Sequence, residues 1–525
     1  MVAVDPRQTA YAWIAAHERD LSAWHRLIWG WAETSWREYR SAAWYVERLR
    51  AEGFEVEEGS GGMPTAFAAT WRNGPGPSIG GYAEYDAVPG NCQAASTRRE
   101  PREGLSRFAP GHTDPHSALG IGSLGGFLAA KRAMEAHGIG GTLRYFGEPA
   151  EKVCGSKPVH GVKGYYDGLD AIISYHPFYM FPLCNTVRWD THCGTYSARI
   201  YTFLCEEPET WQAPSGEIAI PEAHTVARAP GANAALFTMY GLTKTTTESM
   251  LAHVGGWSLN EAILTAGQAT ADNLPASLAQ IQYAWRTPDV ATSDAVLAVL
   301  DRNADAAATA THCRVEKRWV TRTRPGLPNH ALAEVTYRNL VAAGAPRWGD
   351  KAVRVAREIQ ANLGLAPMER PFPEALERLI EPREAERQLR LQMPAWQKNW
   401  TSDDYTEMTW YAPTVRLYVA RPMLAGPPGY AYPDWVPNAL GGIPATIDPT
   451  IVCSARTIAG TVFELLRSPD VLAAARREFE ERTAGDDRIA PLLPADFEPP
   501  IDFRWPEYVT TPRGESWWIP PSDEF

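Results

Sequence analysis

The chain has 525 residues, of which 45% are hydrophobic and 21% charged, a composition typical of a soluble globular protein with two or three domains. The net charge of −12 argues against nucleic-acid binding, which requires a basic face. Seven scattered cysteines without a CxxC pair predict a reduced, cytoplasmic protein. We see no signal-peptide pattern and no apolar run of the roughly 18 residues that span a membrane.

The first part of the chain alternates between helix-like and strand-like patterns. Helical spacing of apolar residues occurs over 7–52 and 117–138, and strand patterns occur at 67–72, 78–86, 142–149 and 170–177. This alternation predicts an α/β fold whose mostly parallel sheet is flanked by helices. In such sheets, sites form beyond the carboxyl ends of the strands, where Asp86, Glu151 and His176 are expected.

The pattern changes from about residue 188 onward. The order strand, helix, strand, helix and strand predicts a smaller α+β unit inserted into the first domain, which would end near residue 333. Helix-rich sequence then returns over 334–483. The segment 484–525 is rich in proline, tryptophan and acidic residues, and we expect an extended arm that packs on the body or on a neighbouring subunit.

Histidines and acids gather around the predicted strand ends and the start of the 117–138 helix. Asp114 and His116, in the GHTDPH motif, are close enough on one turn to bind the same metal ion, and His176 can supply a third ligand. Glu151 is a candidate base for water. A lone histidine after a strand is more often structural, but the ordered set predicts a metal-dependent hydrolase.

The motifs occur in a characteristic order. They are EYDAVPG (84–90), GHTDPH (111–116), GGTLRYFGEPAEK (140–152), GLDAIISYHP (168–177), LPN (327–329) and TSDDYTEMTW (401–410). On these stretches the chain resembles the aminoacylase and carboxypeptidase-G type metallohydrolases, in the amidohydrolase branch with aminobenzoyl-glutamate hydrolase and the indole-3-acetyl-amino-acid hydrolases. The resemblance implies a zinc-peptidase-like catalytic domain (1–187 and 334–483) and an inserted α+β lid and dimerisation domain (188–333).

The resemblance also implies roles for single residues. Asp114 stands where this branch has a bridging cysteine, and His116 and His176 match metal-binding histidines. Glu151 matches the catalytic glutamate, which takes a proton from water and later protonates the leaving nitrogen. These matches imply a divalent transition metal, with zinc or manganese expected.

Further matches surround these ligands. His112 and Asp86 match residues that orient the ligands, and His224 matches a lid histidine that reaches the substrate oxyanion, often from the partner subunit. A surface loop histidine is the alternative for His224. Two positions depart from the family, because Lys152 and Asp448 stand where it has ligands of the second metal.

A protonated lysine cannot bind a metal ion, so the departures predict one metal rather than two. The ammonium of Lys152 would take the place of the second cation, paired with Asp114 and Asp448, and would help to stabilise the oxyanion. In the alternative, Lys152 turns to solvent and Asp448 alone helps to hold a weak second ion.

The favoured function is hydrolysis of a non-peptide C–N bond, most simply the amide of an N-acyl or N-aroyl amino acid. One alternative is hydrolytic removal of an amino group from an activated aromatic ring. Another is a non-catalytic binding or assembly protein on the same fold. We expect a small-molecule substrate and a homo-oligomer, dimeric or larger. Twenty tryptophans are compatible with an aromatic substrate, although core and subunit packing is their ordinary explanation.

Overall fold

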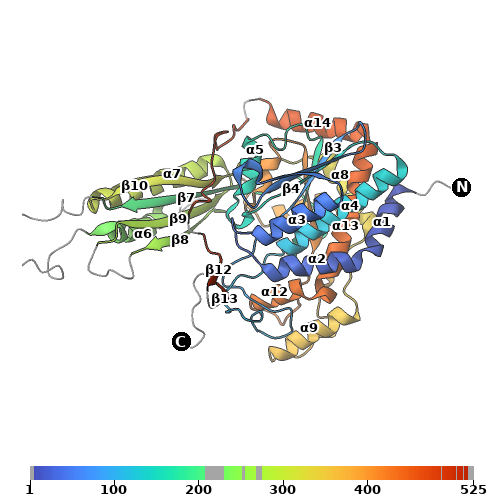
Figure 1. Ribbon diagram of the computed structural model, residues 1–525, viewed down its shortest axis with the longest axis horizontal. Coiled ribbons are helices and arrows are strands. Elements are labelled where there is room, and N and C mark those ends of the chain that lie inside the picture. Colours follow the sequence, from blue (N-terminus) through green and yellow to red (C-terminus); the bar gives the residue numbers. More distant parts are fainter. Residues whose placement is uncertain are drawn as a thin grey trace, which may run out of the picture.

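The computed structural model describes residues 5–206, 230–250, 255–267, 275–485, 488–503, 505–511 and 514–517. Figure 1 shows a large body, in which helices surround a central sheet, and a smaller sheet with helices of its own that projects from one side. Among the described residues, no helix is long and apolar enough to cross a membrane.

A seven-stranded sheet forms the centre of the body, in the order β1-β2-β4-β3-β5-β11-β6. Its strands are β1 (Glu55–Glu58), β2 (Phe67–Arg72), β3 (Ser78–Ala83), β4 (Thr142–Gly147), β5 (Ala171–Phe178), β6 (Thr186–Val187) and β11 (Thr414–Ala420). The four central strands run parallel, and β1, β2 and β6 are antiparallel to their neighbours. The predicted α/β fold with a mostly parallel sheet is confirmed.

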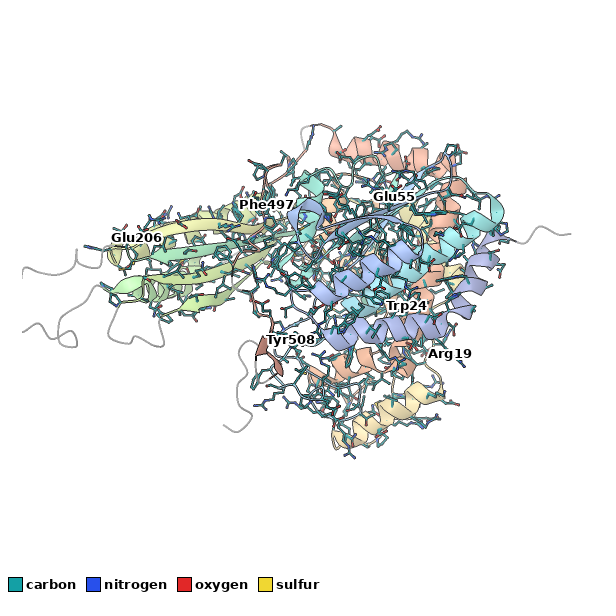
Figure 2. The ribbon with its side chains drawn as sticks, viewed as in Figure 1. Arg19, Trp24, Glu55, Glu206, Phe497 and Tyr508 are labelled. Atoms are coloured by element: carbon teal, nitrogen blue, oxygen red, sulfur yellow. The ribbon has the colours of Figure 1, made fainter. Side chains whose placement is uncertain are left out.

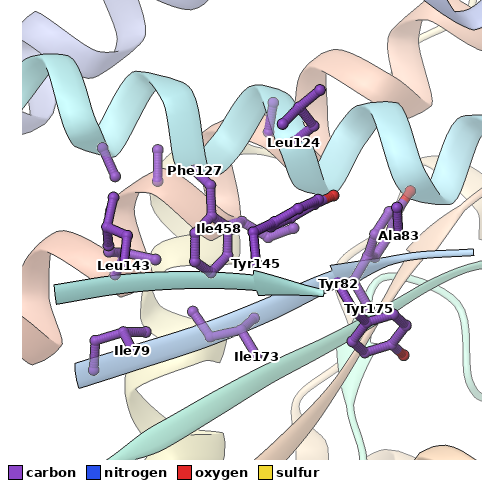
Figure 3. Packing of buried hydrophobic residues seen from close by; sticks show 14 of the residues in the cluster. Ile79, Tyr82, Ala83, Leu124, Phe127, Leu143, Tyr145, Ile173, Tyr175 and Ile458 are labelled. Atoms are coloured by element: carbon purple, nitrogen blue, oxygen red, sulfur yellow. The ribbon is translucent and has the colours of Figure 1, made fainter. Parts of the chain in front are cut away.

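The helices of the body pack closely because several contact positions hold small residues. A Cβ atom at Gly126 of α4 would lie 2.7 Å from the Cβ of Ile458 in α13. Figure 3 shows Leu124 and Phe127 of α4 above Tyr145 of β4. The helices are α1 (Pro6–Ala16), α2 (Glu18–Trp31), α3 (Tyr39–Ala51), α4 (His116–His137), α5 (Ser156–Val162), α8 (His330–Ala343), α9 (Asp350–Asn362), α10 (Pro382–Arg390), α11 (Tyr405–Met408), α12 (Trp435–Gly442), α13 (Pro444–Arg467) and α14 (Pro469–Thr483), with short 3-10 helices η1 (Ser60–Gly62), η2 (Glu151–Val153) and η4 (Glu374–Glu377).

The smaller sheet is antiparallel, in the order β10-β7-β9-β8, and has its own apolar core. Its elements are β7 (Thr195–Leu204), α6 (Gly231–Met250), β8 (Ser258–Ala266), β9 (Leu278–Thr287), α7 (Val290–Ala310) and β10 (Arg314–Arg322). The sequence did not predict β8, because this edge strand has no fully buried residue and therefore no run of buried positions. The boundaries at 188 and 333 and the role in dimerisation stay predictions.

The C-terminal arm runs along the junction between the smaller sheet and the body (Figure 1). Phe497 and Tyr508 mark its course in Figure 2. Trp505 is buried in a cluster that contains Trp36 of the body and Val320 of β10. The arm therefore contacts both parts of the chain, and its described residues include an antiparallel pair of short strands, β12 (Tyr508–Thr511) and β13 (Gly514–Trp517).

Candidate metal centre and its pocket

The candidate ligands meet at one edge of the central sheet. Asp86 follows β3, Glu151 begins η2 after β4, and His176 lies in β5. Asp114 and His116 stand at the start of α4. Since β3, β4 and β5 are parallel neighbours, their carboxyl ends point to the same edge, and the structure brings all five residues together there.

Asp114 lies between the two histidines. Its Oδ2 atom is 3.5 Å from Nε2 of His116, and its Oδ1 atom is 3.5 Å from Nε2 of His176. The two imidazole rings stand nearly perpendicular, with their centroids 5.7 Å apart. One carboxylate thus faces both ring nitrogens, as a carboxylate shared within a metal site would.

Hydrogen bonds fix the orientation of both rings. Nδ1 of His116 is 2.7 Å from Oδ1 of Asp86, and Nδ1 of His176 is 2.7 Å from the carbonyl oxygen of Pro177. Because both partners are acceptors, each Nδ1 carries a proton and each Nε2 faces the site. Burial lowers the pKa of His176 to about 4, which keeps this imidazole neutral.

A divalent cation fits this set of donors. Nε2 of His116 lies 3.2 Å from Oε2 of Glu151 and 3.5 Å from Oε2 of Glu84, and these atoms are buried without a hydrogen-bond partner among the described residues. Although burial alone would lower the pKa of His116, the carboxylates of Asp114 and Asp86 raise it well above its ordinary value, so without a metal ion a proton lies on Nε2. A divalent cation can take the place of this proton, because metal binding releases protons from its ligands. Nitrogen and oxygen ligands of this kind suit zinc or manganese.

Lys152 lies beside the same carboxylates. Its Nζ is 2.5 Å from Oδ2 of Asp114 and 3.3 Å from Oε2 of Glu151. Although burial alone would lower the pKa of Lys152, these two carboxylates raise it well above its ordinary value. The same ion pairs outweigh burial at Asp114 and Glu151 and hold both pKa values well below the ordinary range. Lys152 is therefore an ammonium and cannot be a ligand.

A buried charge network that the sequence analysis missed supports the site. Lys157 of α5 is fully buried, with Nζ 2.7 Å from Oε1 of Glu84 and 2.6 Å from Oδ1 of Asp404. Burial raises the pKa of Glu84 to about 7, although Lys157 opposes this shift. Glu84 was identifiable, because it precedes Asp86 by two residues in a strand-like run and such residues share a face.

Two residues of the predicted site, Asp448 and His112, are not part of this cluster. Asp448 does not pair with Lys152, because it lies on the side of α13 that faces Ser22 and Arg26 of α2. His112 is buried with Nε2 3.2 Å from the carbonyl oxygen of Ile28, and in the described part of the chain no hydrogen bond joins it to a ligand. His224 lies outside the described residues.

A pocket of about 490 Å³ opens beside the cluster. Asp114, Glu151, Lys152 and His176 line one part of it. Its other walls contain arginine and aromatic side chains that the sequence analysis did not identify, namely Arg188, Arg286, Arg416, Arg421, Phe178, Tyr179, Trp400 and Tyr418. The pocket is large enough for a small organic substrate beside the candidate ligands.

No family model matches the chain, but several known proteins are similar to it in sequence. A component of the p-aminobenzoyl-glutamate hydrolase of Escherichia coli K12 is 27% identical over 336 residues, which cover 64% of this chain and 65% of that protein. Thermostable carboxypeptidase 1 of Saccharolobus solfataricus is 31% identical over 172 residues, 31% of this chain and 42% of the relative. The chain thus spans less than two thirds of the length of these curated relatives.

Solved structures show the same fold at lower identity. The aminobenzoyl-glutamate utilization protein of Klebsiella pneumoniae has a TM-score of 0.52 at 14% identity and covers 86% of this chain and 98% of its own. A putative aminohydrolase of methicillin-resistant Staphylococcus aureus has a TM-score of 0.50 at 15% identity, with 88% and 100% covered. The chain is a homologue of the p-aminobenzoyl-glutamate hydrolase component, which confirms the family resemblance seen in its motifs.

Proposed function

We propose that the protein is a metal-dependent amidohydrolase that cleaves the amide of an N-acyl or N-aroyl amino acid. The observation that carries the proposal is the convergence of two Nε2 atoms, on His116 and His176, with Asp114 and Glu151 beside the pocket. The homology with a hydrolase named for p-aminobenzoyl-glutamate supports the class of substrate.

His116, His176 and Asp114 would hold the metal ion, with Glu84 close to His116. When bound, a divalent ion of this kind polarises a carbonyl group and lowers the pKa of water. Glu151 is ionised near neutral pH, since its pKa is held low, and can therefore accept a proton from water. It then returns this proton to the leaving nitrogen, and the Lys152 ammonium can stabilise negative charge on the carbonyl oxygen.

We propose one metal ion per subunit, with zinc or manganese as the expected metal. The Lys152 ammonium already lies 2.5 Å from Oδ2 of Asp114. Two divalent ions and this ammonium around one carboxylate would place like charges a few ångströms apart, at a cost of several kcal/mol. Asp448 takes no part in this arrangement, because it faces α2 and does not pair with Lys152.

Metal analysis of the purified protein tests the number of ions. Wild type should bind one equivalent after dialysis against zinc or manganese. Lys152→Glu should bind a second equivalent, because a carboxylate replaces the ammonium beside Asp114, whereas the matched Lys152→Gln control should not. Two fully bound equivalents of metal in the wild type would contradict the proposal. A wild type that binds no metal would favour a non-catalytic protein.

Hydrolysis of N-acyl and N-aroyl amino acids with added manganese, zinc, cobalt or nickel tests the activity itself. The expected result is release of the free amino acid, which disappears after chelation and returns when metal is added. A fully metal-loaded protein that cleaves none of a broad set of such amides would contradict the proposed reaction.

We also propose that the smaller sheet carries a subunit contact. Its edge strand β8 exposes Ile263, and the adjacent helix α6 exposes Phe237. Sedimentation of the wild type and of Phe237→Ser with Ile263→Ser tests this contact, and a monomeric wild type would contradict it. All seven cysteines are free, which supports a reducing compartment such as the cytoplasm.

A further inference from the structure

Three arginines that line the pocket form no ion pair with a carboxylate among the described residues. Arg188 and Arg421 are 2% and 9% exposed, and Arg286 of β9 is partly buried. Asp434, an exposed residue of the pocket wall, is not paired with them either. Arg421 still feels the charge of the Asp114 carboxylate, whereas Arg188 contributes positive charge that no ion pair among the described residues offsets.

Two other buried arginines of the described residues, one of them in the pocket wall, are paired with carboxylates. Arg324 is 3% exposed and lies 2.7 Å from Oε2 of Glu407, and Arg416 is 1% exposed and pairs with Asp403. A buried charge without a partner is strongly unfavourable, so proteins usually pair it. Among the described residues Arg188 breaks this rule at the pocket wall, which indicates a place where an anion can bind.

The geometry of Arg188 suits capture of a carboxylate. Its Nε donates to the hydroxyl of Tyr418 at 2.8 Å, and its Nη1 donates to the carbonyl oxygen of Thr191 at 2.9 Å. These bonds hold the guanidinium in place, while Nη2 is buried and has no hydrogen-bond partner in the described parts of the chain. The rings of Tyr418 and Trp400 lie 5.4 Å and 5.9 Å from its central carbon and can contact the carbon atoms of a ligand.

Strand register separates Arg188 from the candidate metal ligands. Tyr418 of β11 pairs with His176 of β5 on one side and with Thr186 of β6 on the other. Adjacent strands lie about 4.8 Å apart. The backbone at Thr186, two residues before Arg188, is therefore roughly 10 Å from the backbone at His176, two strands away. In contrast, Arg421 donates to the carbonyl oxygen of Thr113, directly beside the cluster.

We infer that Arg188 forms a second anion subsite and that the substrate is an acyl amino acid with two carboxylates. This inference rests on the proposed function and names its substrate class. One carboxylate binds near Arg421 and Arg286, beside the scissile amide, and the other binds Arg188 between Trp400 and Tyr418. The second carboxylate can belong to the acyl group or to the amino-acid side chain, since both present the same chemistry.

Two pairs of substrates distinguish these sources. N-(4-carboxybenzoyl)glycine is compared with N-(4-carbamoylbenzoyl)glycine, and N-benzoylglutamate with N-benzoylglutamine. In at least one pair, the acid should have a kcat/KM about tenfold or more above that of its neutral isostere, because a charge-assisted bidentate contact is lost in the amide. The pair that shows this preference identifies the part of the substrate that carries the second carboxylate. A wild type without preference in either pair would overturn the inference.

Variants assign the preference to Arg188. Arg188→Met should remove the preference, so that the ratio of kcat/KM between the acid and its neutral isostere falls to about one, and Arg188→Lys, which lacks the planar fork, should keep part of it. Arg72→Met is the matched control, because Arg72 is exposed and pairs with Glu55 on the far strands β2 and β1. A preference that survives in a folded Arg188→Met protein would overturn the inference.

A binding experiment separates this inference from the proposed reaction. Titration calorimetry of the metal-loaded protein compares terephthalate with 4-carbamoylbenzoate, and glutarate with its monoamide. At least one diacid should bind about tenfold more tightly than its partner to the wild type but not to Arg188→Met. If no amide is hydrolysed but this difference is found, the reaction is wrong and the subsite stands. Equal binding within both pairs would reject the subsite.

Discussion

The substitution Asp86→Asn tests how the structure prepares His116 for metal binding. Oδ1 of Asp86 accepts from Nδ1 of His116, and Oδ2 accepts from the hydroxyl of Ser35 at 2.8 Å and from the backbone N–H of Lys152 at 2.9 Å. An aspartate satisfies all three donors because both of its oxygens accept. Asparagine has nearly the same shape but offers one acceptor and one donor end.

Neither orientation of the new amide fits. If its NH₂ group faces His116, the imidazole must carry its proton on Nε2 and loses the lone pair that faces the site. If the NH₂ group faces the other way, it meets the N–H of Lys152, and that buried donor is left without an acceptor at a cost of about 1–3 kcal/mol. We therefore expect metal affinity to fall roughly 10–100-fold, as is usual when the partner of a metal-binding histidine is lost.

Competition with a chelator of known affinity measures this effect directly. Asp170→Asn is the matched control, since Oδ2 of Asp170 accepts from the backbone N–H of Ser78 at the opposite end of β3. The control should bind metal as tightly as wild type. Unchanged metal affinity in a folded Asp86→Asn protein would refute the argument that Asp86 selects the tautomer of His116.

Three further outcomes follow from single residues. Glu151→Gln should keep the fold and the metal but lower kcat roughly 10²–10⁴-fold, because an amide cannot accept the proton, and near-full activity would exclude Glu151 as the base. Burial raises the pKa of Asp448 to about 6, so the folded protein holds a proton that the unfolded chain releases, and folding stability falls as pH rises from 4 to 7. Asp448→Asn should therefore raise the melting temperature at pH 7 but not at pH 3. A loss of bound metal in this variant would restore Asp448 as a ligand. Trp505→Ala should lower the free energy of unfolding by about 3–5 kcal/mol in denaturant titration, and a loss below 1 kcal/mol would show that the arm does not stabilise the junction.

The sequence was sufficient to predict the part of the site that depends on strand order. Apolar runs followed by Asp86, Glu151 and His176 imply parallel strands whose carboxyl ends meet at one edge. Glu84 was predictable in the same way, because it lies two residues before Asp86 and such residues share one face of a strand. The edge strand β8 was missed for the opposite reason, because an exposed strand has no apolar run to reveal it.

The position of Asp448 illustrates a limit of counting along a helix. Successive residues of an α-helix differ in direction by about 100°, so an error of one position turns a side chain away from a site. Sequence alone determines neither the rotation of α13 about its axis nor its contact with α2, where Asp448 meets Ser22 and Arg26. Arg188 was missed because the lack of a partner for a buried charge is visible only in three dimensions.

The distribution of charge in the pocket links the metal centre to the proposed substrate. Its floor contains Asp114 and Glu151, which a cation and the Lys152 ammonium would neutralise, whereas Arg188 and Arg421 stand on its walls. Because the floor carboxylates are neutralised in this way, the arginines of the walls attract the carboxylates of the substrate, so an acidic ligand enters in one orientation, with its neutral amide toward Glu151. The negative net charge of the chain does not oppose this selection, because screening limits distant charges to about 10 Å whereas the pocket arginines act at contact.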